Sequence, residues 1–432
     1  MRRKYTAIFI AGIAFLCLIA DVAYNLPPVH DRLAWRVDNL RVAVRRFLNP
    51  PEQVVFAPQE QQEQIKAIVQ ATMSALAPAP SGTPLPILTE TPLASPIPSL
   101  TPTPIPANAA LSGIRHEYQK FNNCAPASLS MVLSYWGWAG DQYATRAYLR
   151  PSFEMDDKNV NPFEIVDFVE NYTGFDALWR VGGDLETLKR LLAAGFPVLI
   201  EKGLDPHDDA WLGHYQILSG YDDANSHFLV YDSYEGPPNA YPVPYAVIAQ
   251  YWRHFNFAYV VIFSPERAAE VHSILGPQGD PRTNFQSAAE LALTEAGSLT
   301  GREQFFAWFN RGANLVFLQD YAGAAQAYDT AFSLYASLPE SERPWRLLWY
   351  QDGPYAAYYY TGRHQDVINL AYSTLVNVDK PVLEETYYWR GRAKAALGDQ
   401  AGAIEDLHRA YALNPNSTPA GEELSRLGVP VP

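Results

Sequence analysis

A cysteine stands at the predicted start of a helix within residues 118–137. Asn122 and Asn123 favour a turn before it, and Pro126 suits a first helical turn. The apolar residues that follow recur at helical spacing, namely Leu129, Val132, Leu133 and Trp136. Amides at a helix start point outward and carry partial positive charge, which favours the thiolate form of Cys124. The pattern therefore predicts a nucleophilic sulfur.

The chain has only two cysteines, which limits what Cys124 can do. The other, Cys17, lies in an apolar run near the N-terminus, so we expect no disulfide partner for Cys124 in the folded part. An unpaired cysteine is either a small buried thiol or one kept for its reactivity. Both readings stay open from this segment alone.

A histidine and an aspartate follow at positions that could activate the sulfur. His214 comes after Gly213 and opens a strand-like run, and the next such run ends on Asp232. Two antiparallel strands joined by the turn 222–226 would bring these side chains together. A thiolate, an imidazole that activates it and a carboxylate that fixes the imidazole form a nucleophilic triad. The histidines of this part of the chain are His116, His207, His214, His227 and His254, and His214 is the best placed.

Three ordered motifs resemble cysteine-peptidase family thirty-nine, the papain-like group known for cutting bacteriocin leader peptides after a double glycine. They are the run from Gln119 to Gly137, Gly213-His-Tyr-Gln-Ile-Leu-Ser-Gly-Tyr-Asp222 and Val230-Tyr-Asp-Ser233. The resemblance covers roughly a third of the chain. It implies the roles of four residues: Cys124 as nucleophile, His214 as general base, Asp232 as orienting carboxylate and Gln119 as side-chain donor to the oxyanion.

Three positions depart from this family pattern. Ala125 follows the nucleophile where glycine is common, and Gln119 lies one position closer to the cysteine than in many papain-like enzymes. Ser233 follows the carboxylate where proline is common, and we expect little consequence from it. We find no transporter or ATPase part of the kind that accompanies leader-cutting members, so the resemblance does not imply leader processing during export.

The composition limits the classes of function. The 432 residues are 48% hydrophobic and 13% aromatic, which suggests two or three domains. The net charge of −14 argues against a nucleic acid as partner. The sequence has neither a phosphate-binding GxxxxGK(S/T) loop nor paired Cys/His metal spacing, so we expect no cofactor and no metal. The acidic run 205–209 is read as a solvated loop rather than a cation site.

The N-terminal part predicts a membrane anchor and a spacer. Residues 1–24 begin Met-Arg-Arg-Lys and continue as an apolar run, which is either a cleaved signal peptide or an uncleaved signal anchor. No small-x-small cleavage site is found, so we favour an anchor in the cell membrane with the rest of the chain outside the cytoplasm. Residues 25–76 predict a juxtamembrane helical region, and the Pro/Thr/Ser-rich residues 77–110 predict an extended stalk.

Residues 111–266 predict one α+β domain. Helical spacing recurs at 162–172 and at 184–194, where Asp184 would cap the helix start and Gly195 would end it. Five runs rich in β-branched and aromatic residues predict strands at 175–181, 196–201, 215–221, 228–232 and 257–263. Several tryptophans and Tyr215 could line a substrate groove, although core packing is the simpler role for Trp136 and Trp179.

Residues 283–428 read as a helical repeat array. Segments 311–331 and 390–410 align at an offset of 79 residues, and 355–371 supplies a copy between them. These segments resemble tetratricopeptide repeats, with small residues at helix contacts and a Gly-Asp or Gly-Arg turn. Such arrays bind peptides or proteins on a concave face, and three copies suffice for a stacked core.

The sequence thus predicts an α+β papain-like cysteine peptidase domain and an all-α tetratricopeptide-repeat solenoid behind an N-terminal transmembrane helix. The expected function is hydrolysis of peptide or related amide bonds, with a peptide or protein substrate and a protein partner recruited by the repeats. Two alternatives stay open. One is a non-catalytic binding scaffold with a degenerate peptidase fold, and the other is a hydrolase of cell-wall amide bonds.

Overall fold

The computed structural model describes residues 44, 55–58, 105–151, 159–206, 210–376, 382–416 and 418–431. The predicted anchor at 1–24 lies outside these residues, as do nearly all of the predicted juxtamembrane region at 25–76 and the stalk at 77–110. Within the described part of the chain, no helix is both long enough and apolar enough to cross a membrane.

A seven-stranded antiparallel sheet forms the centre of the first domain. Its path runs β2-β7-β3-β4-β5-β6, and β1 pairs with the far end of β4. The strands are β1 (Asn108–Ala110), β2 (Asp176–Arg180), β3 (Val198–Leu204), β4 (Leu212–Asp222), β5 (His227–Tyr231), β6 (Tyr241–Pro244) and β7 (Tyr259–Phe263). The five predicted strands are confirmed, whereas the short strands β1 and β6 were not anticipated.

Helices cover both faces of this sheet, because successive strand residues point to opposite sides. On β3, Leu199 packs toward α4 (Cys124–Tyr135), α5 (Gln142–Leu149) and α6 (Pro162–Tyr172). Its neighbours Val198 and Ile200 pack toward α7 (Leu185–Ala193), α8 (Tyr245–Arg253) and α9 (Ala268–Leu275). The apolar strand runs are therefore continuous rather than alternating. The predicted helix cap is confirmed, since the Asp184 carboxylate accepts the backbone N–H of Thr187.

The remainder of the described chain is helical. It comprises α10 (Pro281–Ser298), α11 (Gly301–Phe317), α12 (Tyr321–Ser337), α13 (Gly353–Tyr360), α14 (His364–Val376), α15 (Glu384–Ala396), α16 (Gln400–Leu413) and α17 (Thr418–Arg426). Short 3-10 turns η1 (Pro265–Arg267) and η2 (Gly276–Gly279) lie on either side of α9, and η3 (Glu340–Glu342) and η4 (Leu347–Trp349) lie between α12 and α13.

The turns inside two helix pairs are built alike, as the sequence alignment predicts. Asp320 caps α12 by accepting the N–H of Gly323, and Asp399 caps α16 by accepting the N–H of Gly402, both at 2.9 Å. The middle pair turns at Gly362, whose φ is +78°. The helical character of this region is thus confirmed, while its assignment to the tetratricopeptide family stays a prediction.

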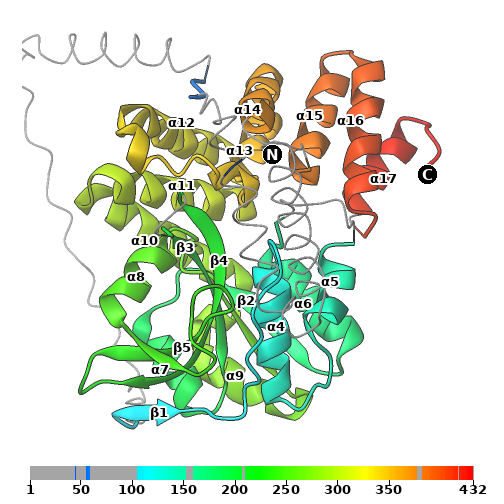
Figure 1. Ribbon diagram of the computed structural model, residues 1–432. Coiled ribbons are helices and arrows are strands. Elements are labelled where there is room, and N and C mark those ends of the chain that lie inside the picture. Colours follow the sequence, from blue (N-terminus) through cyan, green and yellow to red (C-terminus); the bar gives the residue numbers. More distant parts are fainter. Residues whose placement is uncertain are drawn as a thin grey trace, which may run out of the picture.

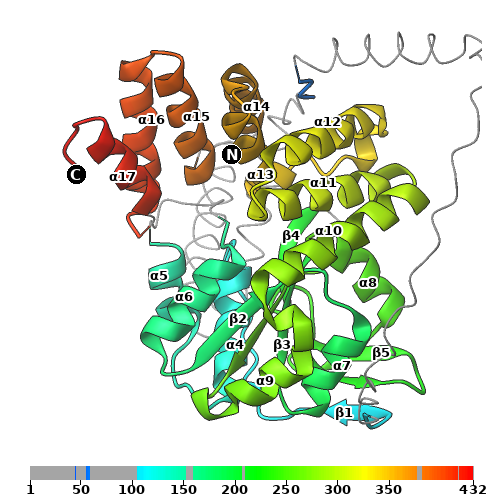
Figure 2. The same cartoon turned by 180° about the vertical axis from the view of Figure 1, so that it is seen from behind.

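The helical region lies over the end of the sheet at which β4 begins, and β1 lies at the opposite end (Figures 1 and 2). Trp211, Phe255 and Phe306 pack together across this boundary in one apolar cluster. Asn256 and Asn314 exchange two side-chain hydrogen bonds of 2.7 and 3.1 Å across it. Near the C-terminal end of the helical region, the Asn416 side chain donates a hydrogen bond to the carbonyl oxygen of Tyr148 in α5. The two regions therefore share a core.

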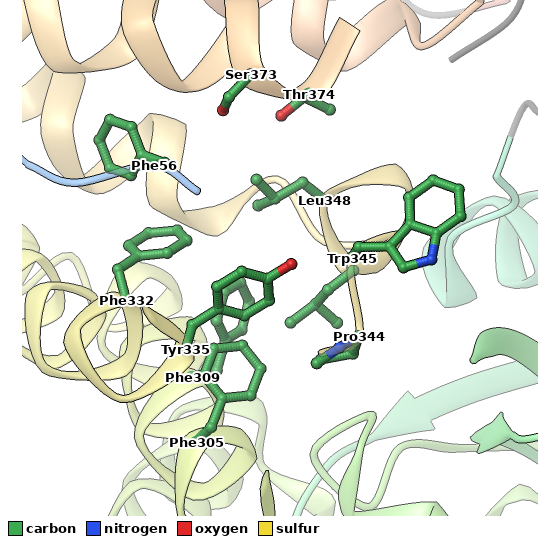
Figure 3. Close-up of a pocket in the computed structure, with 11 residues that line it drawn as sticks. Phe56, Phe305, Phe309, Phe332, Tyr335, Pro344, Trp345, Leu348, Ser373 and Thr374 are labelled. Atoms are coloured by element: carbon green, nitrogen blue, oxygen red, sulfur yellow. The ribbon is translucent and has the colours of Figure 1, made fainter. Parts of the chain in front are cut away.

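An aromatic pocket lies within the helical region, between α11, α12, α14 and residues 344–348 (Figure 3). Phe56, from the isolated described segment 55–58, contributes to its wall and lies edge-on to Phe332 with ring centroids 5.1 Å apart. The lining contains none of the four predicted site residues. In α13, the side chains of Tyr355 and Tyr358 are fully buried, whereas Tyr360 is exposed.

We expect Phe306→Ala to lower the free energy of unfolding by about 3–5 kcal/mol, because its ring is fully buried and stacks on His254 at 3.9 Å. Urea denaturation followed by circular dichroism measures this change. Leu397→Ala is the matched control, since Leu397 is 53% exposed and should change stability by no more than about 0.5 kcal/mol. Equal effects of the two substitutions would show that the boundary cluster does not stabilise the fold.

Candidate active site

Cys124 is the first residue of α4, as the sequence predicts, and Asn123 is the residue before the helix. The loop leading to it is held by Arg150, a buried residue whose Nη1 donates to the carbonyl oxygens of Phe121 and Asn122 at 3.1 and 2.6 Å. Asn122 adopts the left-handed conformation with φ of +49°. This buried guanidinium fixes the backbone from which the sulfur projects, and its positive charge also lowers the pKa of the Cys124 thiol.

His214 and Asp232 come together as predicted from the two adjacent strands. His214 lies near the start of β4 and Asp232 directly follows β5, and these strands pair in antiparallel register. Nε2 of the imidazole lies 3.1 Å from Oδ1 of Asp232, and the His214 side chain lies close enough to Cys124 to lower the pKa of its thiol. Since the carboxylate takes Nε2, Nδ1 is the ring nitrogen left for the sulfur. The structure thus brings the three side chains together, with the imidazole between the sulfur and the carboxylate.

Asp232 is held by more than the imidazole. Its Oδ1 accepts the backbone N–H groups of Tyr234 and Glu235, at 2.8 and 3.3 Å. Its Oδ2 accepts Nε2 of Gln216 at 2.8 Å. Burial would raise the pKa of this carboxyl group, but His214, Lys202 and the backbone donors hold the pKa well below its usual range. The carboxylate is therefore ionised throughout the neutral pH range.

Burial and charge act in opposite directions on the thiol and the imidazole. Burial alone would raise the pKa of Cys124, but the hydrogen bond and positive charge of His214 lower it below the ordinary thiol value. Burial would lower the pKa of His214, yet the charge and hydrogen bond of Asp232, with help from Cys124, raise it to about 9. Both shifts act in the direction of a thiolate beside an imidazolium.

Gln119 is in contact with Ser233, the residue that follows Asp232. Its backbone N–H donates to the carbonyl oxygen of Ser233 at 2.8 Å, and its side-chain Oε1 accepts the Ser233 hydroxyl at 2.9 Å. Both residues are buried. The expectation that Ser233 has little consequence does not fit this geometry, because the serine contacts both ends of the glutamine.

The other histidines of the domain have different surroundings. His116 contacts the backbone of the triad loop, since its Nε2 lies 2.9 Å from the carbonyl oxygen of Asp232. His254 is buried at the boundary with the helical region, between Trp211 and Glu303. His227 begins β5, and His207 lies outside the described residues.

The structure also bears on the predicted aromatic groove and on the acidic run 205–209. Trp211 and Tyr215 do not line an open groove, because only 3% and 2% of their surfaces are exposed. In the acidic run 205–209, Asp205 forms an ion pair with Arg302, and residues 207–209 lie outside the description. No cluster of three or more His, Cys, Asp or Glu side chains suited to a metal occurs among the residues that are described.

Glu201 is a buried carboxyl group near the sulfur that sequence reasoning missed. Burial, followed by the nearby negative charge of Cys124, raises its pKa well above the usual range. In its neutral form it does not compete with the thiolate for the imidazolium charge. The signal was present in the sequence, as a glutamate that ends the apolar run Phe196-Pro-Val-Leu-Ile-Glu201.

We expect His214→Ala to slow alkylation of Cys124 by iodoacetamide at pH 7. Without the imidazolium, burial raises the thiol pKa, and each unit of increase lowers the thiolate fraction about tenfold. The rate is measured by mass spectrometry of the Cys124 peptide over time. Equal rates in the wild type and the variant would contradict the ion pair.

We expect Asp232→Asn to move the pH midpoint of this alkylation upward, by less than His214→Ala does. The carboxylate keeps the His214 pKa near 9, so its loss lowers that pKa and weakens the stabilisation of the thiolate. Asp223→Asn is the matched control, because Asp223 is an ionised carboxylate in the turn after β4 that binds Lys189 and Tyr245 instead. An unchanged midpoint in Asp232→Asn would show that Asp232 does not stabilise the Cys124 thiolate through His214.

Comparison with known proteins places the sheet domain. A family model described as the Peptidase_C39 like family matches residues 111–260. The chain is also similar to the crystal structure of a provisionally assigned C39-like peptidase from Bacillus anthracis. That similarity has 18% identity and a TM-score of 0.31, covers 36% of this chain and 98% of the other, and is too distant to carry an argument. The search of curated proteins found no match.

The family match includes the positions of the cysteine, the histidine and the aspartate described above. It supports an enzyme of the cysteine-peptidase type at the level of the family. The resemblance that the three sequence motifs indicate is therefore confirmed, since residues 111–260 match the model of the Peptidase_C39 like family.

Proposed function

We propose that this chain is a cysteine peptidase that hydrolyses peptide or related amide bonds, with Cys124, His214 and Asp232 as its catalytic triad. The observation that carries the proposal is the His214–Asp232 hydrogen bond of 3.1 Å beside Cys124, which is the first residue of a helix. The opposite pKa shifts of Cys124 and His214 prepare a nucleophile and an acid at neutral pH.

The reaction follows from these protonation states. The Cys124 thiolate adds to the carbonyl carbon of the scissile bond, and the carbonyl oxygen becomes an oxyanion. The backbone N–H of Cys124 and the Nε2 amide of Gln119 are the donors proposed to stabilise it. His214 gives its proton to the leaving amine, and the C–N bond breaks to leave a thioester on Cys124. The neutral imidazole then takes a proton from water, which attacks the thioester. The C–S bond breaks, the carboxylic acid product leaves, and the Cys124 thiolate and the His214 imidazolium are restored.

The helical region is well placed to influence which substrate reaches the site. Gly213 precedes His214, and a Cβ atom on it would come within 2.9 Å of the Tyr350 ring. The Tyr350 carbonyl oxygen accepts a hydrogen bond from the side-chain amide of Asn159, which lies just before α6. We therefore propose that the helical array recruits the peptide substrate or a protein partner. Membrane anchoring through residues 1–24 and an extracytoplasmic location belong to the same proposal.

Incubation of the full chain with a proteome-derived peptide library tests this function. The wild type should generate new peptide termini, which are detected by mass spectrometry, and Cys124→Ala should generate none. His214→Ala should reduce cleavage by about 10²–10⁴-fold, the usual contribution of a general acid–base group.

Two other results would replace the proposal. Release of wall fragments from purified cell wall by the wild type, without peptide cleavage, would identify a cell-wall amide hydrolase. Neither activity, together with ordinary thiol reactivity that does not depend on His214, would identify a non-catalytic binding scaffold.

A further inference from the structure

Two consecutive residues contact both parts of the proposed catalytic machinery. Asp232 holds the His214 imidazole at 3.1 Å, and Ser233 holds the Gln119 side chain at 2.9 Å. Gln119 lies 114 positions earlier in the chain, so this contact forms only in the folded domain. A second bond, from the Gln119 backbone N–H to the Ser233 carbonyl oxygen, fixes the other end of the glutamine.

The contact matters because a primary amide has two ends of nearly equal size and opposite character. One end is an acceptor oxygen and the other an NH₂ donor, and a half-turn about the last side-chain bond exchanges them. Toward an oxyanion, the NH₂ end stabilises the charge and the oxygen end repels it. The orientation of Gln119 therefore decides whether it helps or hinders the reaction.

The Ser233 hydroxyl selects one of these orientations. Only 1% of the surface of Ser233 is exposed, so its O–H group needs an acceptor within the protein. The structure gives it Oε1 of Gln119. A half-turn of the amide would replace that acceptor with an NH₂ group and leave the buried hydroxyl proton without a partner, which costs free energy. The bond thus directs Nε2 away from Ser233.

The direction of the serine is in turn set by the residue that orients the base. Asp232 Oδ1 accepts the N–H groups of Tyr234 and Glu235, and this turn encloses Ser233. The ring of His116 binds the Asp232 carbonyl oxygen from the other side. One short turn therefore carries both the carboxylate for His214 and the hydroxyl for Gln119.

We propose that Ser233 is a positioning residue, whose hydroxyl orients the Gln119 amide so that Nε2 faces the oxyanion. This role rests on the proposed peptidase function. It also explains how a serine can stand where the related family commonly has proline, since the hydroxyl has a specific partner. Ser233 acts through Gln119, which accepts the hydrogen bond of its hydroxyl.

The variants Ser233→Ala and Ser233→Thr test the proposal on a peptide substrate. Loss of a single oxyanion donor lowers kcat by about 10²–10³-fold, so Gln119→Ala should show that effect. Ser233→Ala leaves the donor present but free to turn, and we expect a smaller decrease of about tenfold in kcat with little change in KM. Ser233→Thr keeps the hydroxyl and should restore most of kcat. The double variant Gln119→Ala/Ser233→Ala should be no slower than Gln119→Ala alone.

Iodoacetamide separates positioning of Gln119 from damage to the fold or to the ion pair. Alkylation displaces iodide at a tetrahedral carbon and develops no oxyanion, so Ser233→Ala should alkylate at the wild-type rate and with the wild-type pH midpoint. A fall in alkylation as large as the fall in kcat would overturn the proposal. So would an unchanged kcat.

A readout without turnover keeps this test independent of the proposed function. In protein labelled with ¹⁵N-glutamine, the Gln119 side-chain amide signals are those that vanish in Gln119→Ala. In Ser233→Ala these signals should shift and their protons should exchange faster with water, because the amide has lost a buried partner. Unchanged signals would refute the positioning role, whereas changed signals in a chain that cleaves no peptide would refute only the peptidase function.

Discussion

Two groups that can carry opposite charges, the Cys124 thiol and the His214 imidazole, lie close together at the start of α4, and both are removed from most of the solvent. Burial disfavours each charge on its own, so a thiolate and an imidazolium can persist there only by stabilising each other and by drawing on further partners. Asp232 supplies the main one for the imidazole. Arg150 and the helix start supply positive potential for the sulfur. The arrangement around the site is organised to satisfy this requirement.

The strand pair β4–β5 is the element that meets this constraint. It places His214 near its open end and Asp232 just past its second strand. Gln216, on the same strand as His214, donates a hydrogen bond to Oδ2 of Asp232. Asp232 must keep its charge in a buried position, and it does so with four hydrogen bonds, two of them from backbone amides. A rigid hairpin provides this precision more readily than a loop would.

Much of this site could be predicted from local patterns. A turn before Pro126 indicated the helix at Cys124, and the strand ends at His214 and Asp232 indicated where the other two side chains would meet. Contacts between distant segments could not be predicted in this way. Nothing near Arg150 in the sequence shows that its guanidinium reaches the backbone before Cys124, and nothing near Ser233 points to Gln119. Local periodicity carries no information on such pairs.

The burial of Trp211 and Tyr215 is a second example of contacts that local sequence patterns do not predict. Both were candidates to line a substrate groove, but Trp211 is covered by residues of the helical region and Tyr215 donates its hydroxyl to the carbonyl oxygen of Val160. Whether an aromatic residue is buried depends on what the rest of the chain places upon it. Here the helical region buries Trp211, and the sequence around the strand gives no information on that contact.

The same covering explains why glycine precedes the histidine. At Gly213 a Cβ atom would lie 2.6 Å from the Phe255 ring and 2.9 Å from the Tyr350 ring, so a side chain there would push the helical region and the strand apart. Because His214 is the next residue along β4, any such movement would be passed to the imidazole and its bond to Asp232. The helical region is therefore joined to the sheet domain immediately beside the triad. Its packing helps to define the position of the proposed base, in addition to any role in recruiting substrate.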